Sequence, residues 1–341
     1  MIKPLKIGFT TSLPIEVIYA AGHIPIDLNN IFILNNPPTH VRQAELYGFP
    51  RNICAWIKGM YSVIKQNKID LIIGIIQGDC SNTHSLMSIL KDEGKNVIPF
   101  SYPWNKDKCS LEKEITSLEN YFGVTRIQTQ LMKKKLDKIR KKLIILDNLT
   151  WQTNQVSALE NHLWLVTSSD FNSDYVKYEK DLDKFLENAQ DKPSFHISKN
   201  THTKDNNSYK PRLGFIGVPP ILDNLYEYIE ECQAKVVFNE IQRQFSMPYL
   251  EKDIIDQYHR FTYPSDIFER IKDIKKAISK RKIDGLIAYT QSFCHRQLDL
   301  ISLRKHIDIP ILHIEGDQPS KIDARTKLRI ESFIEMISNF N

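Results

Sequence analysis

The sequence predicts an α/β protein with two similar Rossmann- or flavodoxin-like parallel-sheet domains and a helical insertion between them. Short runs rich in Val and Ile alternate with helical stretches in residues 1–105 and again in residues 211–341. This alternation is typical of parallel sheets built from βαβ units. The two ends of the chain also match each other at a constant spacing, and such an internal repeat constrains the architecture of the whole fold.

The expected strands follow the same β-α-β-α-β-α-β order in both halves. They are Lys6–Thr10, Ile24–Leu28, Ile69–Ile76 and Asn96–Phe100 in the first half, and Arg212–Ile216, Ala234–Phe238, Ile283–Tyr289 and Ile309–Ile314 in the second. The repeat is clearest at the third strand, where Lys68–Asp70 corresponds to Lys282–Asp284 at an offset of 214 residues. Ten residues after each aspartate stands a cysteine, Cys80 in the first half and Cys294 in the second.

The residues between the halves have a different pattern. Apolar residues at helical spacing begin this segment, and they are Ile127, Leu131, Leu136, Ile139, Leu143 and Leu146. A polar stretch rich in Asn, Ser, Thr and Lys, Asp191–Lys210, has the composition of a linker. We therefore expect a first α/β domain over residues 1–124, a helical insertion and linker over 125–210, and a second α/β domain over 211–341.

Composition and charge exclude several classes of protein. The chain is 41% hydrophobic and 26% charged with a net charge of +5, which is ordinary for a globular protein. Lys-rich runs such as Lys133–Lys135 are expected on a solvated helix face, and neither a nucleic acid nor a membrane is expected as a partner. No apolar stretch approaches the roughly 18 residues of a membrane span. The N-terminus runs directly into a strand-like segment without a cleavable signal, so we expect a cytoplasmic protein.

Three of the five cysteines are expected to converge at one place. Disulfides are rare in the cytoplasm, so each cysteine is either a small buried hydrophobe or a ligand. Ligands of open parallel sheets bind beyond the carboxyl ends of the strands. Cys80 and Cys294 each follow the third strand of their half by a short loop, and Cys54 opens the preceding helix of the first half. If the two edges face each other across a cleft, these three thiols meet.

Three thiolates at one site suit an iron–sulfur cluster that keeps one iron open. A zinc ion is the alternative occupant. A structural zinc site usually has four protein ligands, often with a CxxC pair, and the chain contains no such pair. The plainer alternative is that the three cysteines are unrelated core residues. Cys232 lies at helical spacing with apolar residues and is expected to pack, whereas Cys109 lies in a polar loop and receives no role.

Several longer motifs carry a resemblance to a known family. They are Pro14–Pro25 (PIEVIYAAGHIP), Gly217–Pro219, Asp284–Ile287 leading to Phe293-Cys294, Ile309–Asp317 and Arg329–Met336. In these motifs the chain resembles the 2-hydroxyacyl-CoA dehydratase D-component family, which also includes the benzoyl-CoA reductase cluster subunits and the double-cubane cluster proteins. The resemblance runs over nearly the whole length of the chain.

The resemblance implies a fold, a cofactor and partners. It implies two Rossmann-like domains with a helical third, and an oxygen-sensitive [4Fe-4S] cluster held by Cys54, Cys80 and Cys294, with a larger iron–sulfur cluster as the alternative. It further implies a homo- or heterodimer and a separate ATP-hydrolysing activator that injects a low-potential electron. The electron passes to the thioester carbonyl of an acyl-CoA, and the ketyl radical so formed permits loss of an unactivated hydroxyl. This is the chemistry of an anaerobic lyase.

Two further residues are candidates for the chemistry itself. Glu16 stands where a strand gives way to a helix, so it is either a catalytic or substrate-binding residue or a favourable contact with the helix dipole. His295 could exchange a proton beside the cluster, or it could simply cap a loop. The chain has no P-loop, so we expect a separate partner protein to hydrolyse ATP and supply the low-potential electron. Two alternatives to the dehydratase stay open: a reductase of the double-cubane type, and a non-catalytic protein that relays electrons.

Overall fold

The computed structural model describes residues 3–193 and 210–340 and contains two four-stranded sheets, both entirely parallel. The first sheet has the order β2-β1-β3-β4 and the second the order β7-β5-β8-β9. The strands are β1 (Lys6–Phe9), β2 (Ile24–Asp27), β3 (Leu71–Gln77), β4 (Val97–Ser101), β5 (Arg212–Gly217), β7 (Lys235–Asn239), β8 (Gly285–Gln291) and β9 (Ile311–Gly316). The predicted α/β class with two parallel sheets is therefore confirmed.

The two sheets repeat each other strand for strand. In both, the first strand in sequence lies between the second and the third, and the fourth strand lies at the outer edge. The equivalent central strands β3 and β8 begin at Leu71 and Gly285 and end at Gln77 and Gln291, so both ends keep the offset of 214 residues. Because all neighbours are parallel, each sheet gathers the loops that follow its strands at one edge.

Helices connect the strands of each sheet in the manner of βαβ units. Those of the first half are α1 (Ile15–Ala20), α2 (Leu28–Leu34), α3 (Pro37–Leu46), α4 (Ala55–Gln66), α5 (Ser81–Asp92) and α6 (Lys108–Phe122). Those of the second half are α10 (Leu225–Glu231), α11 (Glu240–Phe245), α12 (Ile254–Arg260), α13 (Ile267–Arg281), a 3-10 turn η4 (His295–Gln297), α14 (Asp299–His306) and α15 (Ala324–Phe340). A small parallel pair, β6 (Leu222–Asp223) with β10 (Ser320–Lys321), was not expected from the sequence.

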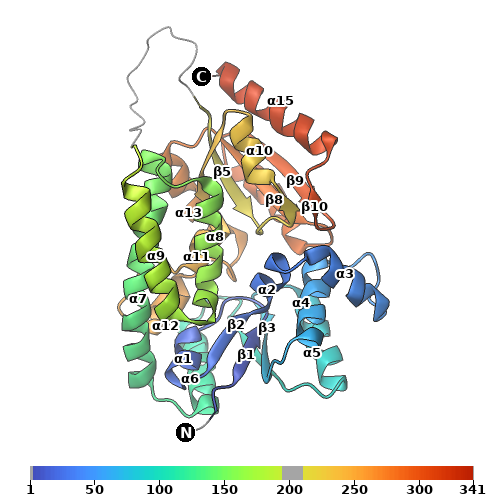
Figure 1. Ribbon diagram of the computed structural model, residues 1–341, viewed down its shortest axis with the longest axis vertical. Helices are drawn as coiled ribbons and strands as arrows, with labels where there is room; N and C mark the ends of the chain where they lie inside the picture. Colours follow the sequence, from blue (N-terminus) through green and yellow to red (C-terminus); the bar gives the residue numbers. More distant parts are fainter. Residues whose placement is uncertain (1–2, 194–209, 341) are drawn as a thin grey trace.

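The insertion is helical, as expected, and lies along one side of both sheets (Figure 1). Its elements are α7 (Arg126–Asn148), a π-helical turn η1 (Leu149–Thr153), α8 (Ala158–Val166), two 3-10 turns η2 (Thr167–Ser169) and η3 (Phe171–Ser173), and α9 (Tyr175–Gln190). Capping boxes start two of these helices, with Thr125 before α7 and Ser157 before α8. Most of the predicted linker, residues 194–209, lies outside the described residues.

Helix α7 corrects two details of the sequence analysis. Four of its six predicted core residues are fully buried, but Ile127 and Leu131 are 73% and 54% exposed, because the first turns of the helix present them to solvent. Lys133 is buried instead of solvated, and its ammonium donates to the Glu251 carbonyl and pairs with Asp137 at 2.7 Å. A periodic pattern alone does not show where a long helix leaves the elements that it packs against.

The halves interlock through the segment around α12. This helix belongs to the second half in sequence, yet Ile254, Ile255 and Tyr258 pack into the hydrophobic core under the first sheet.

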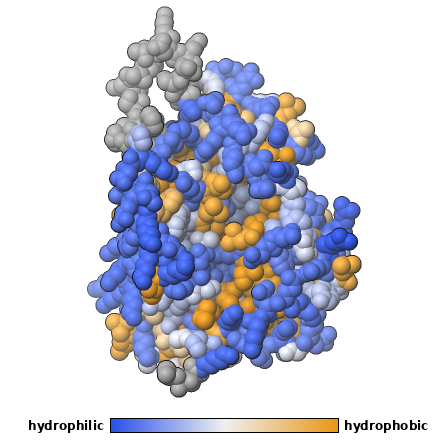
Figure 2. Space-filling model, viewed as in Figure 1, coloured by the Kyte–Doolittle hydropathy of each residue, from blue (hydrophilic) through white to orange (hydrophobic). Residues whose placement is uncertain are grey.

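In Figure 2 apolar side chains gather in the middle of the face, between polar margins. Within the described residues, no helix combines the length and the apolar character that crossing a bilayer requires.

Candidate functional site

Each of the three cysteines stands immediately before a helical turn. Cys54 precedes α4, Cys80 precedes α5, and Cys294 precedes the turn η4. Free backbone N–H groups gather at such a position, and they stabilise negative charge on a nearby sulfur. One of these contacts is a hydrogen bond from the Asn82 amide to the Cys80 sulfur at 3.4 Å. The shared location therefore gives all three sulfurs the same kind of neighbour.

The structure brings Cys54, Cys80 and Cys294 to one cavity between the two halves. The cavity has a volume of about 110 Å³, and its lining comes from both sheets and from the helical insertion. A single water needs roughly 10–15 Å³ by this measure, so the space exceeds that of one small ion or water. The repeat predicts this meeting for Cys80 and Cys294, and the start of α4 adds Cys54, whereas the role of the three thiols as ligands stays a prediction.

Burial controls the protonation of these thiols. It raises the pKa of Cys54 to about 12, against the opposing effect of the Trp56 and Ile57 amides, and the two other thiols add to the rise. Burial likewise raises the pKa of Cys80 and of Cys294. The side chains are therefore thiols at neutral pH unless a cationic group enters the cavity, which would favour the thiolates.

The cavity does not have the geometry of a single-ion site. Among residues 3–193 and 210–340, no three His, Cys, Asp or Glu side chains are placed to hold one metal ion together. The three thiols thus share a cavity without closing around a single point. Thiolates are ligands both of zinc ions and of iron–sulfur clusters, so the residue types at the cavity fit either group.

The loop before Cys80 packs directly against the second half. Gly78 has φ +90, and a Cβ at this position would lie 2.7 Å from the Cβ of Pro264, so the loop requires glycine for both its backbone and its close approach. The next residue, Asp79, accepts hydrogen bonds from the Tyr263 hydroxyl at 3.3 Å and from Thr83 at 3.4 Å. Burial raises the pKa of Asp79 to about 6, although Arg296 opposes the rise.

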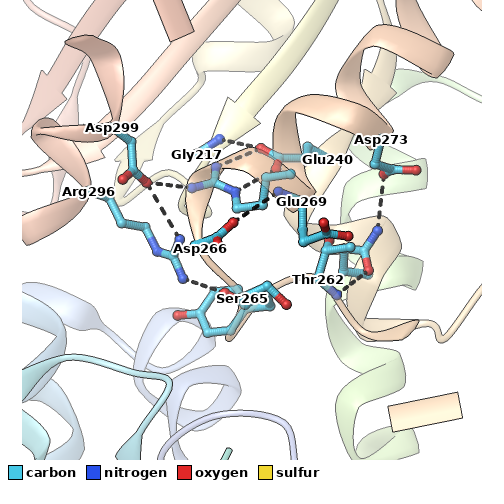
Figure 3. A network of polar contacts seen from close by, with 12 residues as sticks. Gly217, Glu240, Thr262, Ser265, Asp266, Glu269, Asp273, Arg296 and Asp299 are labelled. Atoms are coloured by element: carbon cyan, nitrogen blue, oxygen red, sulfur yellow. Dashed lines mark hydrogen bonds and ion pairs between the residues drawn. The ribbon is translucent and has the colours of Figure 1, made fainter. Parts of the chain in front are cut away.

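Arg296 lies at the wall of the cavity and is held from two sides. It stacks on the Tyr263 ring with its guanidinium carbon 4.5 Å from the ring centre, and it donates to the Tyr263 carbonyl at 2.8 Å. Its second partner is Asp299, at 3.8 Å (Figure 3). Arg296 is only 6% exposed, so its charge acts at close range on the thiol of Cys294.

A row of buried charges continues from Asp299 into the second sheet (Figure 3). Asp299 pairs with Arg270 at 2.7 Å, and Arg270 binds Glu240 through two nitrogens at 2.7 and 2.9 Å. Glu240 also accepts from the Gly217 amide at 3.0 Å, at the end of β5. The row therefore fixes the loop that carries Cys294 to the central strands of its own sheet.

Glu315 holds the Cys294 loop in place, whereas His295 lines the cavity itself. Glu315 accepts from the Ser292 hydroxyl at 2.6 Å, which ties the end of β9 to the Cys294 loop. His295 lines the cavity, and its pKa is lowered by burial and by the charge of Arg296, so its ring is neutral at pH 7. His295 therefore lines the cavity, and its role there stays a prediction.

Glu16 lies elsewhere. It is fully buried in α1, pairs with Arg140 at 2.7 Å, and accepts from the Tyr258 hydroxyl at 2.8 Å and from Gln257 at 3.2 Å. It does not line the cysteine cavity. The sequence indicated the functional edge of the sheet, but α1 turns this carboxylate toward α7 and α12, where it makes a structural ion pair.

The remaining cysteines are also separate from the cavity. Cys232 is partly buried at the end of α10 and packs against the hydrophobic core that includes residues of both halves. Cys109 is exposed in the first turn of α6. Neither thiol lines the cavity that holds the other three.

Sequence reasoning missed a contribution from the helical insertion. His162 and Val166 of α8 line the cysteine cavity and also a neighbouring cavity of about 430 Å³. A single histidine on an amphipathic helix gives no sequence signal of its own. Only the placement of α8 across the gap between the sheets brings it to the site.

Two like parallel-sheet halves, with thiols from both at a shared cavity, define a two-lobed α/β protein with a thiol-lined cavity between the lobes. The family described as 2-hydroxyglutaryl-CoA dehydratase, D-component, matches residues 10–337, and the chain belongs to this family. The resemblance seen in the motifs is thereby confirmed, and the chain is a 2-hydroxyacyl-CoA dehydratase-like protein. A search of curated proteins finds no match to the chain.

Proposed function

We propose that this chain is the cluster-bearing part of a reductively activated dehydratase that acts on a 2-hydroxyacyl-CoA thioester. One observation carries the proposal: thiols from both halves, each at the start of a helical turn, line the same cavity. Membership of the dehydratase component family supports the reaction class. The cofactor is inferred from the donor set.

The donor set fits an iron–sulfur cluster. Cys54, Cys80 and Cys294 would hold it, and three protein ligands leave one iron of a [4Fe-4S] cluster open; a larger cluster is the alternative. The backbone amides beside the sulfurs would stabilise their thiolates, and Arg296 would balance part of their negative charge. When bound, the cluster would supply a single electron of low potential.

The chain's own side chains would serve binding and orientation. The neutral ring of His295 can hydrogen-bond a substrate oxygen or exchange a proton with it. Apolar residues such as Ile57 and Met60 line the same cavity and would exclude water from the reacting groups. The ion pairs from Arg296 to Glu240 would keep the Cys294 loop from moving when charge develops in the cavity.

The electron itself would come from a partner. The chain contains no P-loop for nucleotide phosphates, so an ATP-hydrolysing activator protein would deliver the electron. We further infer that the protein functions in an anaerobic cytoplasm, because an open iron reacts readily with oxygen. We also infer that it assembles into a homo- or heterodimer. These inferences follow from the proposed chemistry and would fail with it.

Anaerobic purification tests the cofactor. We expect a brown protein with nearly equal amounts of iron and acid-labile sulfide. A colourless protein that binds zinc stoichiometrically under the same conditions would overturn the cluster.

Electron paramagnetic resonance of the reduced protein then tests the reaction class. An added acyl-CoA such as butyryl-CoA should change the spectrum, because a substrate oxygen would reach the open iron. A spectrum that butyryl-CoA leaves unaltered, in a protein that binds butyryl-CoA, would favour a protein that only relays electrons.

A further inference from the structure

A chain of hydrogen bonds runs through the helical insertion and the second half and ends on His162. It begins at Asp147, which binds both terminal nitrogens of the Arg281 guanidinium. Burial alone would raise the pKa of Asp147, but Arg281 outweighs it and the pKa is lowered, so the carboxylate is ionised and can only accept. This fixed acceptor sets the direction of every bond that follows.

Two amides pass this direction on. The Asn161 amide nitrogen donates to Asp147 at 3.2 Å, so its oxygen faces the other way and accepts from the Asn239 nitrogen at 2.8 Å. The Asn239 oxygen then accepts from the Tyr226 hydroxyl at 2.8 Å. A tyrosine has one hydroxyl proton, and here it is committed to Asn239.

Gln242 completes the chain. Because the Tyr226 oxygen has no proton left to give, it accepts from the Gln242 amide nitrogen at 3.2 Å. The same NH₂ group lies 3.0 Å from His162 Nδ1. The reverse amide orientation would set the Gln242 oxygen against the lone pairs of Tyr226. It would also turn both amide N–H groups to the buried place where Gln242 Oε1 has no partner among the described residues, and two unpaired donors there cost more than one unpaired acceptor. An amide nitrogen only donates, so Nδ1 accepts, and the single ring proton of a neutral His162 is on Nε2.

The proton-bearing edge of the ring is open to the site. No residue in the described part of the chain bonds to His162 Nε2, and the ring lines both the cysteine cavity and the neighbouring one. Burial lowers the pKa of His162 to about 4, so the ring stays neutral at physiological pH. A neutral N–H group with fixed direction thus stands at the junction of the two cavities.

We propose that His162 is a substrate-positioning residue whose Nε2–H donates a hydrogen bond to the thioester carbonyl oxygen. This inference rests on the proposed function, which supplies the thioester. A carbonyl oxygen gains negative charge when its carbon is reduced, and a preorganised donor binds it more strongly as that charge develops. A neutral imidazole serves here better than an imidazolium, because it binds the oxygen without transferring its proton. The chain of bonds from Asp147 thus sets the tautomer that the substrate meets.

Nitrogen-15 NMR of the histidine-labelled full chain tests the tautomer without any ligand. The His162 signals are assigned by their loss in His162→Gln. At pH 7 we expect an unprotonated Nδ1 and a protonated Nε2, and Tyr226→Phe should produce a mixture of both tautomers because it breaks the chain of bonds. Protonation of Nδ1 in the wild-type protein overturns the inference.

Binding of butyryl-CoA tests the contact. In the wild-type protein its addition should shift the His162 Nε2 resonance and leave Nδ1 nearly unchanged, a readout that needs no variant. By calorimetry, His162→Phe should bind butyryl-CoA about five- to tenfold more weakly, as expected for one lost hydrogen bond. His162→Gln places an amide N–H near the lost one and should stay within about threefold of wild type. The exposed His84 provides the matched control, and His84→Gln should bind as wild type does.

The outcomes separate this inference from the function on which it rests. Wild-type protein that does not bind butyryl-CoA overturns the thioester as the ligand, and with it the proposed reaction. Binding by wild type and by His162→Phe with equal affinity, or an Nε2 resonance that butyryl-CoA leaves in place, overturns the role of His162 alone.

Discussion

The two halves of the molecule share a sheet order and differ in what their loops carry. The first half supplies Cys54 and Cys80 to the cavity, whereas the second supplies Cys294 together with Arg296. At the position equivalent to Cys54 the second half has Phe268, which is 51% exposed. The repeat therefore fixes where the loops lie, and the residue types on the loops decide what each half contributes to the site.

Each half also buries a carboxylate against an arginine, with different consequences. Glu16 pairs with Arg140 of α7 and so ties the first sheet to the insertion. Glu240 pairs with Arg270 of α13 and stays within its own half, where it belongs to the row of charges behind Cys294. One pair joins parts of the molecule, and the other stiffens one wall of the cavity.

The largest effect should come from the cysteines that the repeat matches. Cys80→Ser and Cys294→Ser should each remove most of the iron from anaerobically prepared protein, and Cys54→Ser should do the same although it has no partner in the second half. Cys232→Ser and Cys109→Ser are the controls and should keep their iron. If Cys232→Ser lost its iron and Cys80→Ser did not, the ligand assignment would be wrong.

Replacement of the two buried arginines should show that their ion pairs contribute different amounts to the free energy of unfolding. Among the described residues, Arg270→Met leaves Glu240 with only the Gly217 amide, so we expect a loss of about 3–5 kcal/mol in the free energy of unfolding. Arg140→Met should cost less, because Tyr258 and Gln257 still donate to Glu16. Urea unfolding at pH 7 measures both. Lys177→Met, at the exposed pair with Asp181, should leave stability nearly unchanged, and equal losses in all three variants would contradict this reasoning.

His162 should make stability depend on pH. Burial lowers its pKa from 6.5 to about 4 in the folded protein, so below pH 6.5 the unfolded chain takes up the proton first. Its contribution is therefore present above pH 6.5 and is lost as the pH falls toward 4, by roughly 2–3 kcal/mol. The unfolding free energy of the wild type minus that of His162→Gln should be smaller at pH 4.5 than at pH 7. A difference that does not change with pH would contradict the shift.

The smallest effect concerns the gap between the halves. A cluster with ligands from both would hold them together, because binding that exists only in the closed arrangement stabilises that arrangement. Iron-free protein should therefore have a slightly larger radius by small-angle scattering. It should also exchange amide hydrogens faster in residues 77–81 and 290–296 and around Cys54. Identical scattering and exchange with and without iron would mean that the cluster does not bridge the halves.

The sequence predicts much of this arrangement because the repeat carries the information. The strand runs and the offset between Cys80 and Cys294 follow from local composition and from parallel-sheet topology. Glu16 shows where this reasoning stops, since its position after a strand is the same whether it faces a cavity or an arginine. The partner that decides its role is Arg140, which lies on α7, 124 residues after Glu16 in the sequence.

The contribution of His162 could not be predicted for a related reason. Its role depends on side chains from α10, β7 and α11 that orient the ring, and on the position of α8 relative to both cavities. No spacing in the sequence records such a chain of amide orientations. Sequence motifs can indicate ligand residues in the loops that follow strands. Side chains that a neighbouring helix brings to the site can be identified only from the tertiary structure.

The contact between α12 and the first sheet has a consequence for biosynthesis. Tyr258 bonds to Glu16 across 242 residues of sequence, and α12 completes the core beneath the first sheet. A nascent chain that has released residues 1–124 must wait for α12 to leave the ribosome, roughly 7–27 s later at ordinary elongation rates. During that interval the first half exposes the apolar surface that Ile254 and Tyr258 will cover. Shielding of this face during synthesis would therefore limit aggregation of the unfinished chain.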